Sequence, residues 1–212
     1  DLETMIAPDD VRHLRLAFYT DTKAAWTLCK QFTGITAQNY AAYIAERQES
    51  LRPLPAYYSI EIAAYHPLRS IYRPDLFPAH FDSACCMDLE RAAKLIDDIA
   101  TFSETAVVSL SIFGEPLLHP HFSSIIMKIL SYPNLSVLIE TSGATETAAN
   151  DFSFFEELAA HVRTLPPRPN NRPPVYWIID IDAVGSKMYG AVHQLPDEEA
   201  ERCLKQAATF AD

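Results

Sequence analysis

Short apolar runs separated by helical stretches fill the chain after residue 56. The runs are rich in Val and Ile, as expected of parallel strands that are covered on both faces. Between them apolar residues recur at helical spacing, and Asp88 and Asp197 stand where they can cap two of the helices. The pattern predicts a strand followed by a helix, repeated four times, with strands over 57–63, 107–112, 135–139 and 175–181.

The first part of the chain follows a different pattern. Residues 1–56 are polar and helical in character, with helices expected after Asp21 and Thr36, and Pro53 and Pro55 break the chain. We therefore predict an N-terminal helical lead-in over 1–56 and an α/β unit over 57–212. Right-handed crossovers would build that unit either as an open doubly wound sheet or as part of a barrel, and periodicity alone leaves both open.

The composition narrows the classes of function. The formal net charge of the 212 residues is −11, which disfavours broad nucleic-acid binding. Arg163, Arg168 and Arg172 form the densest basic cluster, and we interpret them as solvated loop charge. The sequence has no apolar run of about 20 residues and no basic start followed by an apolar stretch, so we expect no membrane association and a cytoplasmic location. Because the first residue is Asp1, we expect the sequence to be a fragment or a processed product.

The cysteines do not form a recognisable framework. Cys29, Cys85, Cys86 and Cys203 have neither zinc-site nor disulfide spacing, so reduced thiols are expected. The adjacent pair is interpreted as loop or helix-entry residues.

Polar residues gather where the predicted strands end, which is where α/β folds bind ligands. Each of these residues also has a purely structural interpretation: Gly114 permits a turn, for example, and Glu115 caps the next helix. Asp180 and Asp182 lie two apart in an otherwise apolar strand, so they are expected to point the same way and to contact a ligand. The polar residues at these ends are His66, Arg69, Ser70, Arg73, Gly114, Glu115, Glu140, Thr141, Ser142, Gly143, Asp180 and Asp182.

Three stretches resemble the radical SAM superfamily. SLSIFGEPLLHPHF, residues 109–122, resembles the second strand and its Gly-Gly-Glu-Pro loop, with Phe113 in place of the first Gly. LIETSGA resembles the third strand, and IIDIDAVGSKMYGAVH resembles the fourth. The resemblance implies a partial (β/α) barrel of radical SAM type, with about four parallel strands and helices outside. It also implies a pocket for S-adenosylmethionine (SAM) or a related nucleotide, bound by Gly114, Glu115, Pro116, Thr141, Asp180 and Asp182.

The first loop departs from the family. The family has Cys-x3-Cys-x2-Cys after the first strand, and these thiolates hold a 4Fe–4S cluster. Here the spacing is kept but the residues are His66, Ser70 and Arg73, and an Arg cannot ligate iron. The positive Arg73 is expected to fill the charge gap, and no cluster is expected. The resemblance thus implies a radical-SAM-like domain without its cluster motif, a non-catalytic or accessory binding domain of a larger protein.

The resemblance extends to spirochaete proteins that pair such a domain with a cysteine-rich SPASM domain. It implies that further strands, and any SPASM region, lie beyond Asp212 in the parent chain. The parent chain and a small nucleotide are the expected partners, and a homodimer through the exposed edge of the last strand is also expected.

Two other functions remain open from the residues. One is an active radical SAM enzyme whose cluster is held by Cys85 and Cys86 together with cysteines outside this sequence. The other is a metal-dependent barrel enzyme, because an imidazole with carboxylates suits Zn, Mn or Fe(II). Its ligands would be His66, Glu115, Glu140 and Asp182.

Overall fold

A computed structural model describes Leu14 and residues 19–20, 23–51, 55–72, 82–143 and 153–211. The chain divides into two compact units, Asp1–Leu54 and Pro55–Asp212.

The first unit contains three short helices, α1 (Lys23–Gln31), α2 (Tyr40–Glu46) and α3 (Gln48–Leu51). A small apolar cluster holds it together, formed by Leu14, Leu28, Phe32 and Leu51. Asn39, not Thr36, precedes α2, and its side chain accepts a hydrogen bond from the Thr36 amide at 2.7 Å. The other expected cap, Asp21, lies outside the described residues.

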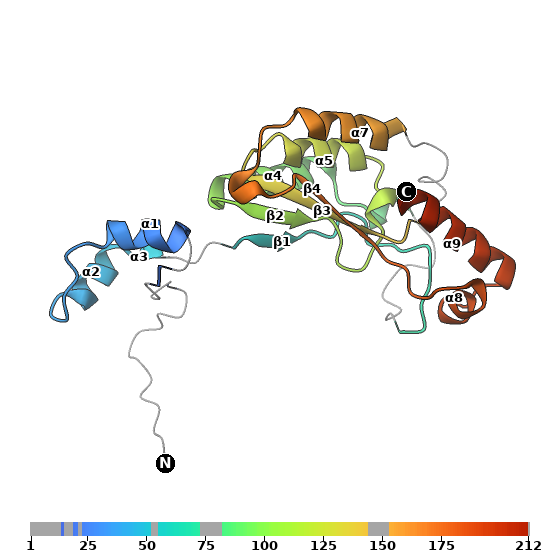
Figure 1. The fold of residues 1–212 in the computed structure, drawn as a ribbon, viewed down its shortest axis with the longest axis horizontal. Coiled ribbons are helices and arrows are strands. Elements are labelled where there is room, and N and C mark those ends of the chain that lie inside the picture. Colours follow the sequence, from blue (N-terminus) through green and yellow to red (C-terminus); the bar gives the residue numbers. More distant parts are fainter. Residues whose placement is uncertain are drawn as a thin grey trace, which may run out of the picture. The chain divides into compact units, whose positions relative to one another are not determined.

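The second unit is built on a four-stranded parallel sheet in the order β1-β2-β3-β4. The strands are β1 (Tyr57–Ser59), β2 (Ala106–Ser109), β3 (Leu135–Thr141) and β4 (Val175–Ile179). The helices are α4 (Leu89–Phe102), α5 (Phe122–Leu130), α7 (Ser153–Thr164), α8 (Ser186–His193) and α9 (Asp197–Ala211), with 3-10 turns η1 (Ser83–Cys85), η2 (Pro116–Leu118) and η3 (Pro169–Asn171). Figure 1 shows α4, α5 and α7 side by side along the sheet, while α8 and α9 pair with each other. The predicted α/β architecture, a partial barrel of parallel strands, is confirmed.

The local sequence explains where α4 begins. Asp88 precedes α4, and its carboxylate accepts hydrogen bonds from the amides of Glu90 and Arg91. This is the N-cap that the sequence predicts. One face of the helix then buries Ile96 and Ile99 in the main core. That core lies between the sheet and its helices, and it includes Val108, Ile126, Val137, Ile139 and Leu158.

The strands differ from the predicted ranges at their ends. β1 ends at Ser59, although the amides of Ile60 and Ile62 still bond to the carbonyls of Ser109 and Leu110. β4 ends at Ile179, so Asp180 and Asp182 lie beyond it.

Arg168 corrects the interpretation of the basic cluster as solvated charge. Its side chain is buried, and it donates hydrogen bonds of 2.8 Å to the carbonyls of Leu130 and Tyr132, where α5 ends. Burial lowers the pKa of its guanidinium. The carbonyls at a helix C-terminus need such a donor, and the helix dipole favours a cation there. None of the described helices combines the length and the apolar character needed to cross a membrane.

Candidate functional site

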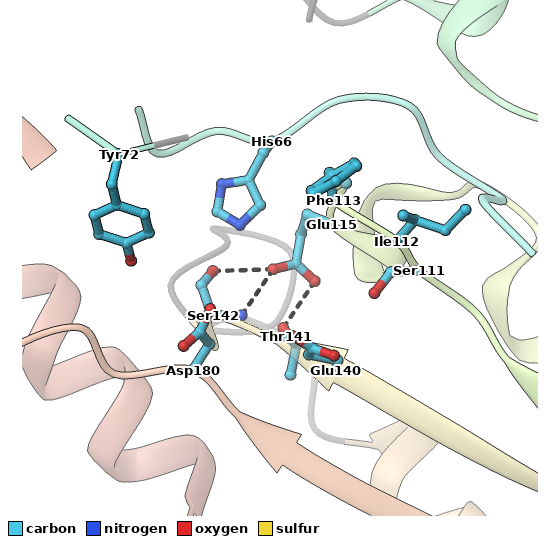
Figure 2. A pocket seen from close by; sticks show the side chains of 11 residues that line it. His66, Tyr72, Ser111, Ile112, Phe113, Glu115, Glu140, Thr141, Ser142 and Asp180 are labelled. Atoms are coloured by element: carbon cyan, nitrogen blue, oxygen red, sulfur yellow. Dashed lines mark hydrogen bonds between the residues drawn. The ribbon is translucent and has the colours of Figure 1, made fainter. Parts of the chain in front are cut away.

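A cavity of about 290 Å³ opens where the four strands end. Figure 2 shows side chains from the first loop, from the turn after β2 and from the ends of β3 and β4 around it. Its position is the one that parallel α/β folds use for ligands. The lining residues are His66, Tyr72, Ser111, Ile112, Phe113, Gly114, Glu115, Glu140, Thr141, Ser142 and Asp180.

Glu115 connects the turn after β2, which forms one wall of this cavity, to the end of β3. Its side chain is fully buried, and its carboxylate accepts four hydrogen bonds. The donors are the Thr141 hydroxyl (2.7 Å), the Ser142 amide (3.0 Å), the Ser142 hydroxyl (2.9 Å) and the Leu117 amide (3.2 Å). Figure 2 shows the contacts with Thr141 and Ser142. Burial raises the pKa of the Glu115 carboxyl, and the four donors oppose that rise.

The expected role of Glu115 as a cap for the helix near His121 is replaced by a shorter-range one. Glu115 caps η2, and α5 begins later, at Phe122. Pro116 is the first residue of η2 and is buried, as is common for Pro at a helix start. The GEP stretch therefore forms a rigid corner between β2 and the cavity.

The turn before that corner is fixed by a residue that was not singled out from the sequence. Glu61 accepts hydrogen bonds from the backbone amides of Ile112 (3.0 Å), Phe113 (2.9 Å) and Gly114 (2.8 Å). The signal for Glu61 was a lone carboxylate inside the apolar run after Tyr57. Gly114 is required here for space, because a Cβ on it would lie 1.8 Å from the carbonyl oxygen of Ala63.

Two of the three positions that the resemblance aligns with the cluster cysteines lie in the described part of the first loop. His66 is buried and lines the cavity, and its Nδ1 lies 3.1 Å from the Leu68 amide and 2.9 Å from the Leu68 carbonyl oxygen. Ser70 is buried as well. Arg73 lies outside the described residues.

Asp180 and Asp182 both lie beyond β4, which ends at Ile179, so they do not belong to the strand as the sequence predicts. Of the two, Asp180 lines the cavity. Asp182 accepts a hydrogen bond from the Tyr72 hydroxyl, and its Oδ2 lies 2.9 Å from Nε2 of His193. The latter contact is short enough for an ion pair but is not aligned as a hydrogen bond.

The same cluster attaches the first loop to α8. Nδ1 of His193 donates to the Arg69 carbonyl at 2.7 Å, and the Ile71 amide donates to the Val192 carbonyl at 3.0 Å. Tyr72, which lines the cavity, is held through its hydroxyl by Asp182. Burial raises the pKa of Tyr72, and the hydrogen bond to Asp182 adds to this rise. Neither Tyr72 nor His193 was predicted as part of the site.

The cavity is acidic. Glu115, Glu140 and Asp180 line it, and no Lys or Arg is among the lining residues that the structure describes. Two half-exposed aromatic side chains, Phe113 and Tyr72, stand at its edge. Carboxylates beside aromatic faces favour a ligand that carries positive charge.

The part of the chain that the structure describes does not assemble a complete set of metal ligands. Among the described residues, no three His, Cys, Asp or Glu side chains are grouped so that they could hold a metal ion. Cys85 and Cys86 do not line the cavity, and burial raises the pKa of the Cys86 thiol, which disfavours the thiolate that binds metal. Cys86 instead pairs with Ala63 in an antiparallel bridge.

The chain is similar to known proteins in sequence and in fold. No known family profile matches the sequence. A protein of Treponema pallidum (strain Nichols), described as an uncharacterized protein, is 49% identical over 215 residues. The match covers 100% of this chain but 57% of the relative, so the chain spans little more than half of the relative's length.

Among solved structures, SuiB of Streptococcus suis shares the fold. The structure of SuiB bound to S-adenosylmethionine superposes with a TM-score of 0.52 and 10% identity, covering 90% of this chain and 38% of SuiB. SuiB bound to its precursor peptide SuiA gives a TM-score of 0.50 and 9% identity, covering 82% of this chain and 35% of SuiB. At such low identity the likeness shows the fold alone.

Proposed function

We propose that the cavity at the strand ends binds an adenosyl ligand, S-adenosylmethionine or a related nucleotide, as an accessory binding domain of a larger radical-SAM-like protein. The observation that carries the proposal is convergence: residues following each of the four strands line one cavity. Gly114 and Glu115 of the GEP stretch, Thr141 and Asp180 are among them, the residues for which the family resemblance implies such a ligand. The volume, about 290 Å³, lies near the lower end of the range for small-molecule sites.

The charge of the cavity supports a sulfonium ligand. SAM carries a sulfonium and an ammonium group, and the described lining residues include the carboxylates of Glu140 and Asp180. Phe113 and Tyr72 offer aromatic faces for a purine ring or a cation. Glu115 acts differently, because its carboxylate already accepts four hydrogen bonds; in this proposal it holds Thr141 and Ser142 in place.

The residues of the first loop do not fit a 4Fe–4S cluster. His66 Nδ1 is engaged with Leu68, Ser70 offers a hydroxyl, and iron–sulfur clusters need thiolates with at most an occasional His. We therefore propose that the domain binds its ligand without cleaving it reductively. Asp182, which the resemblance places among the ligand contacts, supports the cavity wall through Tyr72.

The wider context also belongs to this proposal. The chain spans 57% of its Treponema pallidum relative, itself from a spirochaete, which supports a larger parent protein of the spirochaete SPASM type. We also propose a reducing, cytoplasmic setting, because the cysteine spacing predicts no disulfide framework.

Titration calorimetry with SAM and with S-adenosylhomocysteine, which lacks the sulfonium charge, tests the proposal. We expect both to bind, and Asp180→Asn to weaken SAM about fivefold while affecting S-adenosylhomocysteine less. Glu104→Gln, an exposed carboxylate away from the cavity, is the matched control and should change neither affinity. Absence of heat with both ligands would overturn the proposed function.

A further inference from the structure

We infer that Glu61 is a positioning residue for the cavity: its carboxylate is the built-in anion of a three-amide nest and holds the turn that walls the site. The inference rests on the proposed function only where ligand binding is its readout. Glu61 itself does not line the cavity.

The geometry of the turn carries the inference. Oε2 of Glu61 accepts from the amides of Ile112 and Phe113, and Oε1 accepts from the amide of Gly114, all within 3.0 Å. Successive backbone amides that converge in this way form a concave anion site. In this chain the carboxylate of Glu61, which follows β1, occupies that anion site, so no external anion is needed there.

The position of the turn shows what the anion does. Ile112, Phe113 and Gly114 all line the cavity, whereas Glu61 lines a separate groove of about 480 Å³ between the β1 edge and α4. The carboxylate contacts the backbone amides of the turn, so its effect reaches the ligand through the backbone. The half-exposed ring of Phe113 depends on this support for its place in the wall.

Two neighbouring contacts further define the position of this turn. The Glu115 amide donates to the carbonyl of Tyr65 at 2.8 Å, which continues the attachment of the turn to the first loop. A Cβ on Gly114 would lie 2.5 Å from Oε1 of Glu61, so only glycine admits the carboxylate this closely. A carboxylate and a glycine thus act together to shape one wall.

Chemical rescue tests the role. Glu61→Ala removes the atoms that acetate contains, a methylene carbon and a carboxylate. Without acetate we expect this variant to bind SAM about tenfold more weakly than the unchanged protein. Acetate at about 0.1 M should restore most of that affinity, and sodium chloride at the same ionic strength should not.

A second measurement does not need the adenosyl ligand. Acetate should raise the melting temperature of Glu61→Ala by about 2 °C or more, and should leave the unchanged protein unaffected. Asp98→Ala is the matched control, because Asp98 lines the same groove but pairs with Lys94 rather than with the turn. Glu61→Gln, which keeps the size of the side chain, provides a folded variant if the alanine variant does not fold, and it should bind SAM with intermediate affinity.

The outcomes separate this inference from the proposed function. If the unchanged protein binds no adenosyl ligand while acetate still stabilises Glu61→Ala selectively, the proposed function fails and the role of Glu61 in the turn stands. If acetate stabilises the unchanged protein, Glu61→Ala and Asp98→Ala equally, the inference is overturned. Wild-type SAM affinity in both Glu61 variants without acetate would overturn it as well.

Discussion

Ser142 donates two hydrogen bonds to the buried carboxylate of Glu115, one from its backbone amide at 3.0 Å and one from its hydroxyl at 2.9 Å. The contact joins the corner after β2 to the end of β3, across the floor of the cavity (Figure 2). A buried carboxylate is tolerated only when such donors replace its water.

Ser142→Ala should therefore lower the free energy of unfolding by about 1–2 kcal/mol, because one of four donors to a buried acceptor is lost. Glu115→Gln should cost more, since its amide NH₂ would face a donor that needs an acceptor. Urea unfolding measures both. Ser131→Ala, which removes an exposed helix-end contact with Lys128, should cost less than Ser142→Ala. Equal losses for the two serine variants would contradict the assignment.

Arg168→Met should destabilise the protein by about 2–4 kcal/mol, because two carbonyls at the end of α5 lose their donor. Arg168→Lys should recover only part of this loss, since one ammonium cannot replace two parallel contacts. The measurement is chemical denaturation followed by circular dichroism. Arg163→Met, an exposed change on α7, is the control and should lie within about 0.5 kcal/mol of the unchanged protein.

The burial of Arg168 shows what a sequence alone does not contain. Arg163, Arg168 and Arg172 look alike in the sequence, and only the tertiary fold brings one of them to the end of α5, more than thirty residues earlier in the chain. Asp88 is the opposite case. Its cap contacts span two and three residues, so local spacing predicts them correctly.

In the candidate site, too, the sequence predicts local features but not the contacts between distant residues. The positions of Gly114, Glu115 and Thr141 follow from parallel strands that end at one edge, and the structure brings all three to one cavity. The position of Asp180 and Asp182 beyond β4 depends on where that strand ends, which strand patterns leave uncertain by a residue or two. The pairing of Asp182 with Tyr72 spans 110 residues and leaves no local signal.

His119 predicts how stability depends on pH. Its Nδ1 accepts from the His121 amide at 3.0 Å, so the neutral ring carries its hydrogen on Nε2, which donates to the Met87 carbonyl at 2.8 Å. Burial lowers the pKa of His119. As the pH falls below about 6.5, the His119 ring takes up a proton in the unfolded chain more readily than in the folded protein. Acidification therefore lowers the free energy of unfolding.

Urea unfolding at pH 7.5 and 5.5 checks this expectation. His119→Asn keeps an acceptor for the His121 amide but cannot ionise. It should start less stable at pH 7.5 and lose less stability on acidification than the unchanged protein. Parallel losses in the two proteins would show that His119 does not set the acid response.

The edge strand predicts self-association. Among the described strands β4 pairs only with β3, and Trp177 and Ile178 on it are 39% and 45% exposed. Sedimentation velocity should show a dimer that grows with concentration. Ile178→Lys should shift the population to monomer, whereas Met127→Lys, a similarly exposed change on α5, should not. A clean monomer of the unchanged chain at high concentration would contradict the prediction.

The attachment of the first loop to α8 constrains the order of events during biosynthesis. The Arg69 carbonyl and the Ile71 amide meet His193 and Val192, so a wall that is translated early is completed by residues translated more than a hundred positions later. Such a long sequence separation slows closure of the native contact. The nascent chain would carry an open, acidic strand-end surface on the ribosome until α8 emerges.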